Sequence, residues 1–295
     1  MKARLAVVLL HLLSRLPLRM ARIIGMWLGD LCWLSRRRMA RTTAINLELC
    51  FPGLSAAERN SLARQSLRHT FMTVAESGAI WLWPIARTLS LVHRVEGLEL
   101  LQEAHAHGRG VIVLAPHLGN WEIFGLYLSA CGCGQSSQLY QAPDSPLLDA
   151  LIHQARSRAG ARMAATDTKG VGELLQALRR GELVGILPDQ VPPNSGGEFA
   201  PLFGVPALTM TLACRLQQKT GARIVMGFAR REPGIKHGFT IVFKAPESEA
   251  YAEHILTALA GMNRSVEALM AGIPEQYQWE YKRFKRQPEG RQRPY

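Results

Sequence analysis

A histidine and a glutamate follow a run of β-branched and aliphatic residues in VIVLAPHLGNWEIFG, residues 111–125. The run predicts a buried strand, and Gly119-Asn120 predicts the start of a helix with Glu122 in its first turn. Ligands of open α/β sheets gather at the carboxyl ends of strands, where His117 would stand. A carboxylate on one ring nitrogen fixes the tautomer, so the other nitrogen can take a proton from a hydroxyl. The spacing predicts a general base, His117, oriented by Glu122.

The same pair has a structural interpretation. A histidine near a strand end can simply be hydrogen-bonded there, and a glutamate is favourable in the first turn of a helix because of the helix dipole. Taken alone, this interpretation is the stronger one, so the catalytic hypothesis depends on the rest of the chain.

The elements that would position these residues begin near residue 90, where strands and helices alternate. Glycines and prolines separate them, and no internal repeat or long linker interrupts the pattern. The expected fold is a single α/β domain with a central mixed sheet flanked by helices. Strands are expected at 110–115, 137–141, 183–187, 222–229 and 238–244, and helices at 120–130, 146–158, 171–180, 207–219 and 250–271.

The first 40 residues predict an amphipathic helix, broken near Pro17. Arg15, Arg19 and Arg22 interrupt the apolar run, so it does not read as a spanning helix. Arg36-Arg37-Arg38 and Arg41 follow and suit anionic headgroups. We expect residues 1–40 to associate with a membrane and 41–295 to form the catalytic domain; the alternative is a surface helix packed on the core. Apolar residues recur at spacings of three and four: Leu5, Val8, Leu9, Leu12, Leu16, Met20, Ile23, Trp27, Leu31 and Leu34.

Composition narrows the function classes. The formal net charge of +12 favours polyanionic partners, namely nucleic acid, anionic lipid or an acidic protein. Five cysteines, an odd number, argue against a disulfide framework and favour a reducing compartment. The absence of a GxSxG nucleophile elbow disfavours a serine hydrolase.

A second helix is expected from the capping-box pattern Ser55-Ala56-Ala57-Glu58 toward Trp83.

Five ordered blocks resemble one known family. APHLGNWE resembles the HxxxxD/E motif of the lysophospholipid acyltransferase superfamily. Together with SPLLDALIHQARSR (145–158), GELVGILPDQ (181–190), PLFGVPA (201–207) and PEQYQWEYKRFKRQPEG (274–290), it resembles the late acyltransferases of lipid A biosynthesis. The resemblance implies a glycerolipid-acyltransferase-like fold at the cytoplasmic face of the bacterial inner membrane. It also implies an acyl-carrier-protein donor, a lipid A precursor as acceptor, and no metal or organic cofactor.

The resemblance assigns roles by position. His117 would be the general base and Glu122 its partner, while Arg156 or Arg158 would match a functional arginine, with Arg156 favoured. Asp189 in LPDQ would match a functional acidic residue; its alternative role is to cap a loop. No lysine or arginine occurs between Asp189 and Arg215, which counts against a glycerol-phosphate acceptor.

Two other functions stay open. The first is acylation of another glycolipid or of a lysophospholipid. The second is a non-enzymatic basic protein that binds membranes or nucleic acid, although nucleic acid is not expected as a partner. Lys282-Arg283-Phe284-Lys285-Arg286 fits a solvated tail, a nucleic-acid patch, or a dock for carrier protein or lipid phosphate.

Overall fold

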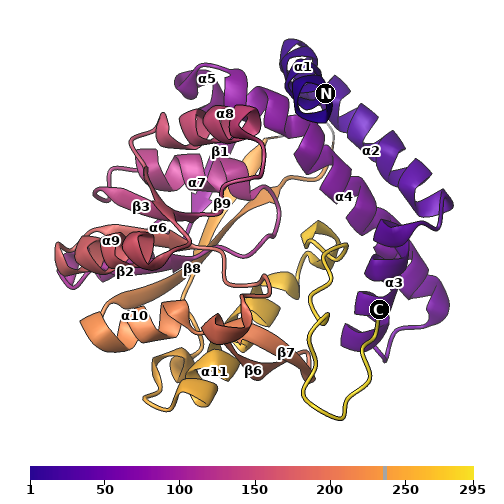
Figure 1. Cartoon of the computed structure of the whole chain (residues 1–295). Helices are drawn as coiled ribbons and strands as arrows, with labels where there is room; N and C mark the ends of the chain where they lie inside the picture. Colours follow the sequence, from indigo (N-terminus) through magenta and orange to yellow (C-terminus); the bar gives the residue numbers. More distant parts are fainter. Residues whose placement is uncertain (235–237) are drawn as a thin grey trace.

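A computed structural model of the chain describes residues 1–234 and 238–295. Within them, seven strands form a central sheet in the order β1-β9-β8-β2-β5-β3-β4 (Figure 1). Neighbouring strands are parallel except β8 and β9, which pair antiparallel, so the sheet is mixed as expected. The strands are β1 Val92–Glu96, β2 Val111–Leu114, β3 Ser136–Tyr140, β4 Arg162–Ala165, β5 Leu183–Ile186, β8 Arg223–Arg231 and β9 Phe239–Lys244.

Helices cover both faces of this sheet, because the central strands bury side chains on both sides. Val111 and Val113 of β2 face one core, with α6 (Leu98–Ala106) and α7 (Trp121–Ala130). Ile112 and Leu114 face the other core, with α9 (Thr168–Arg179), α10 (Leu212–Thr220) and α11 (Ile255–Met270). The alternation along one strand therefore fixes two cores and holds the end of β2 rigidly.

The N-terminal helices form a separate layer along one side of the sheet (Figure 1). They are α1 Lys2–Arg15, α2 Leu18–Leu34, α3 Arg38–Cys50 and α4 Ala56–Leu82; the short α5 Ile85–Leu89 follows and packs against α7. The expected break at Pro17 is confirmed, as is the capping box of Ser55 and Glu58 on α4. No helix in the described residues is both long and apolar enough to cross a membrane.

Helix α2 approaches the backbone of α4 closely. A Cβ atom added to Gly25 would lie 2.6 Å from the Met72 Cα, and one added to Gly29 would lie 2.5 Å from the Arg68 Cα. Because no side chain fits there, glycine lets the two helix backbones come together. Helix α2 is thereby held tightly against α4.

The C-terminal part adds a hairpin and an extended segment. The hairpin pairs β6 (Gly197–Leu202) with β7 (Val205–Met210) through Phe203 and Gly204, which both have positive φ. Residues 271–295 then run back past α3 and α4 (Figure 1), where Asn46 donates to the carbonyls of Trp279 and Tyr281. This segment reaches the end of β2, since the Gln278 N–H donates to the His117 carbonyl.

The expected elements match the structure with one correction. Each of the five expected strands is present, and so are four of the five helices between residues 120 and 271, with small shifts at their ends. The expected helix at 207–219 is wrong in its first part, because residues 205–210 form β7 and the helix begins at Leu212. The Phe203-Gly204 turn causes the difference: two consecutive positive φ angles fold the chain back as a hairpin.

Candidate active site

His117 and Asp189 meet at the carboxyl edge of the sheet. His117 follows β2 and Asp189 follows the adjacent parallel strand β5, so both side chains start from the same edge. The His117 Nδ1 lies 2.8 Å from the Asp189 Oδ1, and the His117 backbone N–H donates to Oδ2 at 2.8 Å. The Gln190 amide donates to the His117 Nε2 at 3.1 Å. These partners assign the proton to Nδ1 and the lone pair to Nε2, as a general base requires.

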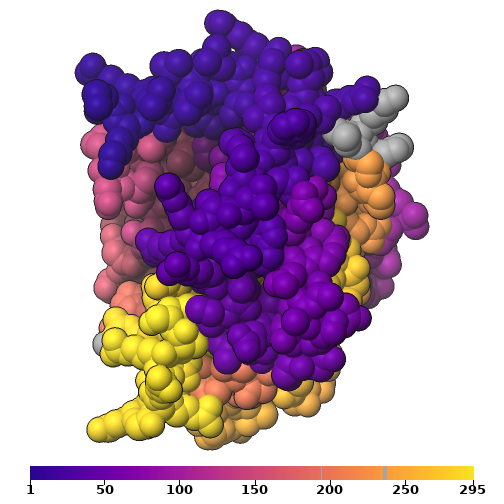
Figure 2. Space-filling view, turned by 90° about the vertical axis from the view of Figure 1, so that its right-hand side faces the viewer, coloured from indigo at the N-terminus to yellow at the C-terminus, as the bar shows by residue number. Residues whose placement is uncertain are grey.

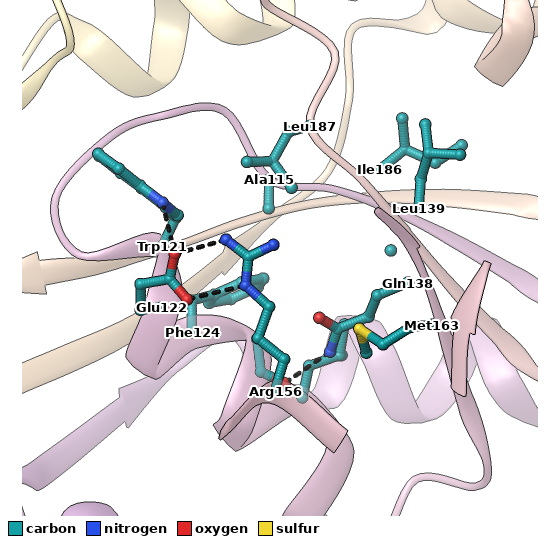
Figure 3. A pocket seen from close by; sticks show the side chains of 13 residues that line it. Ala115, Trp121, Glu122, Phe124, Gln138, Leu139, Arg156, Met163, Ile186 and Leu187 are labelled. Atoms are coloured by element: carbon teal, nitrogen blue, oxygen red, sulfur yellow. Dashed lines mark hydrogen bonds and ion pairs between the residues drawn. The ribbon is translucent and has the colours of Figure 1, made fainter. Parts of the chain in front are cut away.

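The orienting carboxylate is therefore Asp189, and the expected contact between His117 and Glu122 is wrong in this structure. Glu122 lies in the first turn of α7, and its carboxylate is bound to another helix, α8 (Pro146–Ser157). The Arg156 Nη2 and Nε donate to the two Glu122 oxygens at 2.6 and 3.0 Å (Figure 3). The indole N–H groups of Trp81 and Trp121 add bonds of 2.9 and 3.1 Å. Glu122 is thus held by four donors away from the imidazole.

Both carboxylates are ionised by their partners. Burial alone would raise the pKa of Asp189, but the hydrogen bonds from the His117 ring and backbone N–H lower it below its ordinary value. Burial likewise opposes ionisation of Glu122, and the charge and hydrogen bonds of Arg156 lower its pKa instead. Asp189 can therefore stabilise an imidazolium at His117 as a fixed negative charge.

The two neighbouring arginines do different things. Arg156 belongs to the site, whereas Arg158 binds the end of α4. The Arg158 guanidinium donates to the carbonyls of Ile80, Trp81 and Trp83 and to the Thr88 hydroxyl. These carbonyls end a helix and have no further turn to bond, so Arg158 acts as a C-terminal cap.

The turn between β2 and α7 is held from three sides. Gly119 has a φ of 65°, and an added Cβ would lie 1.9 Å from the Ala229 carbonyl oxygen, so glycine is required there. The Gly119 N–H donates to the Gln276 carbonyl, and the Asn120 N–H donates to that of Ala229. The Asn120 side chain caps α7 by accepting from the N–H groups of Glu122 and Ile123. His117 and Glu122 therefore stand on a fixed backbone.

An apolar cavity opens beside this turn, between α7 and the ends of β2, β3 and β5 (Figure 3). Trp121 lies between the cavity and His117, because it lines the cavity and its ring lies edge-on to the His117 ring at a centroid distance of 5.0 Å. The Glu122–Arg156 pair forms the polar part of the wall, and Gln138 and Met163 lie at the far side (Figure 3). The remaining lining residues are Ala115, Phe124, Gly125, Leu128, Leu139, Gly185, Ile186 and Leu187.

Residues 2–286 match the family model of the bacterial lipid A biosynthesis acyltransferases. The chain belongs to this family. A lipid A biosynthesis lauroyltransferase of Escherichia coli (strain K12) is 32% identical over 291 residues, which are 97% of this chain and 92% of the relative. A palmitoleoyltransferase and a myristoyltransferase of lipid A biosynthesis from the same organism are each 29% identical, over 95% and 92% of this chain and 90% and 82% of theirs. The protein is an acyltransferase of lipid A biosynthesis.

Sequence reasoning missed several residues of this candidate site. Trp81 and Trp121 were not predicted to bind Glu122, and Gln190 was not predicted to bind the histidine. One signal was present: PHLG and PDQV each follow a buried strand, and the carboxyl ends of neighbouring parallel strands meet at one edge. The pairing of His117 with Asp189 follows from that rule once β2 and β5 are known to be neighbours.

Proposed function

We propose that this acyltransferase moves a fatty acyl group from an acyl-carrier-protein thioester to a hydroxyl of a hydroxyacyl chain on a lipid A precursor. The family membership supports the acceptor. The observation that carries the mechanism is the His117–Asp189 pair, whose partners leave the lone pair on Nε2. A histidine in this tautomer is a general base for a hydroxyl.

The reaction then needs no nucleophile from the protein. As the acceptor hydroxyl oxygen attacks the thioester carbonyl, its proton passes to the His117 Nε2, from which the Gln190 amide must first move aside. The new C–O bond forms, the C–S bond breaks, and the leaving thiolate takes the proton back from the imidazolium. Asp189 stabilises the imidazolium between these steps. The acyl group passes directly from the donor sulfur to the acceptor oxygen, without a covalent enzyme intermediate.

Glu122 and Arg156 are proposed to place the substrates beside this base. The Arg156 side chain is 27% exposed, and the edge of its guanidinium that does not bind Glu122 lies toward the cavity (Figure 3). A guanidinium held in this way suits a phosphate or sugar oxygen of the acceptor. The apolar wall around Trp121, Phe124 and Leu128 suits the acyl chain. Arg158 has no part in substrate binding under this proposal.

The N-terminal helices are proposed to lie on the cytoplasmic face of the inner membrane. Ten large apolar side chains of α1 and α2 point outward, and Trp27 among them is 72% exposed. Figure 2 shows these indigo helices across one edge of the molecule, above a hollow in its surface. Exposed arginines follow at 36–38, next to the apolar stripe. The outward residues are Leu5, Val8, Leu9, Leu12, Met20, Ile24, Trp27, Leu28, Leu31 and Leu34.

Deletion of the gene tests the substrate. Lipid A from the deletion strain should lack one secondary acyl chain by mass spectrometry, and a plasmid copy should restore the chain while a His117→Ala copy should not. Unchanged lipid A with altered phospholipids or other glycolipids would move the assignment to one of those acceptors. Purified enzyme with acyl-carrier-protein and coenzyme A thioesters of the same chain would identify the donor.

A further inference from the structure

A buried ionic cluster lies behind the catalytic turn, outside the cavity. Glu76 of α4 is fully buried and receives two arginines from different elements, Arg22 of α2 and Arg231 of β8. The Arg22 Nε donates to Glu76 at 2.6 Å, and the Arg231 Nε and Nη2 donate at 2.9 and 2.6 Å. Arg231 also donates to His69 and Thr73 of α4, each at 2.8 Å. One carboxylate thus joins three elements.

This cluster is connected directly to the turn that carries His117 and Glu122. The Asn120 Nδ2 donates to the Glu76 Oε2 at 2.8 Å, while the Asn120 Oδ1 caps α7. The Thr73 hydroxyl donates to the Gly119 carbonyl at 3.3 Å. The Arg231 backbone exchanges two hydrogen bonds with the Gln276 side chain, and the Gln276 carbonyl accepts from the Gly119 N–H. Gly119 and Asn120, two of the three residues between His117 and α7, are therefore held by the cluster.

The cluster also extends toward the membrane-facing layer. Arg22 lies on the same face of α2 as Gly25 and Gly29, the face that contacts α4, while Ile24, Trp27, Leu28 and Leu31 point outward. The ion pair of Arg22 with Glu76 thus links α2 to α4, and the hydrogen bond from the Asn120 amide links Glu76 to the cap of α7. Only two side-chain contacts separate α2 from the cap of α7.

We propose that Glu76, Asn120 and Arg22 are positioning residues: they couple the seating of α2 to the geometry of His117 and Glu122. The proposal rests on the proposed acyl transfer at that site. Buried ion clusters contribute little net stability, because desolvation offsets the attraction, but they fix geometry. A general base and its substrate lose rate steeply when misplaced, about a hundredfold for 1 Å. A cluster between a surface helix and a catalytic turn is suited to that task.

The test compares two helix caps. Asn120→Ser keeps a hydroxyl to cap α7 but cannot donate an amide N–H to Glu76. Asp167→Ser makes the same kind of change at the cap of α9, where the side chain only accepts from the Gly170 N–H. In the full-length protein in detergent, both variants should unfold at similar temperatures. We expect kcat to fall about ten- to a hundredfold for Asn120→Ser alone, with KM unchanged.

A second readout does not depend on the substrate. The ¹⁵N signals of the His117 ring, identified by their absence in His117→Ala, report its tautomer and its bond to Asp189. They should shift in Asn120→Ser and stay in place in Asp167→Ser. Unchanged signals together with wild-type kcat in Asn120→Ser would overturn the proposal. If wild-type protein fails to acylate a lipid A precursor, the proposed function fails, while the ring signals still test the positioning.

Arg22→Met tests the link to α2. It leaves Glu76 with the two-pronged bond of Arg231, so the remaining pair is balanced and folding should be retained. We expect kcat to fall about tenfold at a nearly unchanged unfolding temperature, and Arg22→Lys to recover part of the loss. Wild-type kcat and ring signals in Arg22→Met would remove α2 from the proposal.

Discussion

His117 and Asp189, 72 residues apart in the chain, are joined twice through one carboxylate. One oxygen binds the ring and the other binds the backbone N–H of the same histidine, each at 2.8 Å. The imidazole cannot rotate about its side-chain bonds without losing a hydrogen bond to a buried charge. The pair therefore holds both the tautomer and the direction of Nε2 before any substrate arrives.

Asp189→Asn should remove most of the activity while the protein still folds. The amide keeps the shape but not the charge that stabilises the imidazolium, and it can reverse the tautomer. We expect kcat to fall about 10²–10⁴-fold in a transfer assay. Asp144→Asn, at an exposed aspartate, is the control and should keep its activity. Wild-type turnover of Asp189→Asn would show that Asp189 does not support the base.

Substitution of Arg156 should lower activity, whereas substitution of Arg158 should lower stability. Arg156→Lys keeps the charge but cannot reproduce the two bonds to Glu122. We therefore expect kcat to fall about ten- to a hundredfold. Arg158→Lys loses bonds to the carbonyls at the end of α4 and should cost about 1–3 kcal/mol of unfolding free energy. Its kcat per folded molecule should stay near the wild-type value. The opposite pattern would place Arg158 in the site.

Gly125→Ala should shift the donor preference toward shorter acyl chains. The added carbon would lie 3.0 Å from the Gln138 Oε1 and would narrow the apolar cavity. Alanine also favours a helix interior over glycine by about 1 kcal/mol, so a lost activity would not reflect unfolding. Turnover is measured with a series of chain lengths. Gly172→Ala on α9, where no atom lies within 4 Å of the added carbon, is the matched control. An unaltered profile would argue that the acyl chain lies elsewhere.

Charges on the outward face of α2 should weaken membrane binding. Trp27 and Leu31 are 72% and 60% exposed, so Trp27→Asp with Leu31→Asp leaves the core intact. An aspartate there opposes burial in the bilayer interface and is repelled by anionic lipid. Flotation with anionic vesicles should show a large loss of bound protein. Leu256→Asp, at a leucine of α11 that is 43% exposed, should float like wild type. Equal flotation of both variants would contradict an interfacial α2.

Mild acid should destabilise the protein through His69. Burial and the charge of Arg231 lower the pKa of His69 to about 3. The unfolded chain takes up the proton near pH 6.5, so this stabilisation is complete above that pH and is lost as the pH falls toward 3. At pH 5 the loss is up to about 2 kcal/mol. His69→Gln should therefore show a smaller decrease in unfolding temperature between pH 7.5 and 5 than wild type.

The control for that experiment is His93→Gln, at an exposed histidine of β1. It should show the same decrease as wild type. If His69→Gln also decreases as much as wild type, the acid sensitivity comes from other groups.

Local sequence patterns predicted much of the fold, and there are physical reasons why the other elements were missed. The strands found from sequence are mostly central ones, whose buried faces require continuous apolar runs. The missed strands of the central sheet, β1 and β4, are its two edges, and β1 includes exposed His93 and Arg94. The β6–β7 hairpin was missed as well. The capping box and the break at Pro17 depend on neighbouring residues alone, so they were predictable.

The site was predictable only in its single residues. His117 and Asp189 each follow a recognisable strand, but their contact depends on β2 and β5 being neighbours. Arg22 was noted in the sequence as a charge that interrupts the apolar run, and it is fully buried on Glu76. A buried arginine can be recognised only from its partner, which is 54 residues away in this chain.

The close packing of α2 on α4 limits how the exposed apolar face of α2 could be removed from the protein. A truncation that removes α2 would expose the backbone of α4 at Met72 and Arg68, where only the glycines of α2 fit. It would also remove Arg22 from Glu76, the contact that we propose links α2 to the catalytic turn. The outward apolar side chains are the safer target for engineering, because Trp27, Leu28 and Leu31 can be exchanged for polar residues without disturbing the inner face of the same helix.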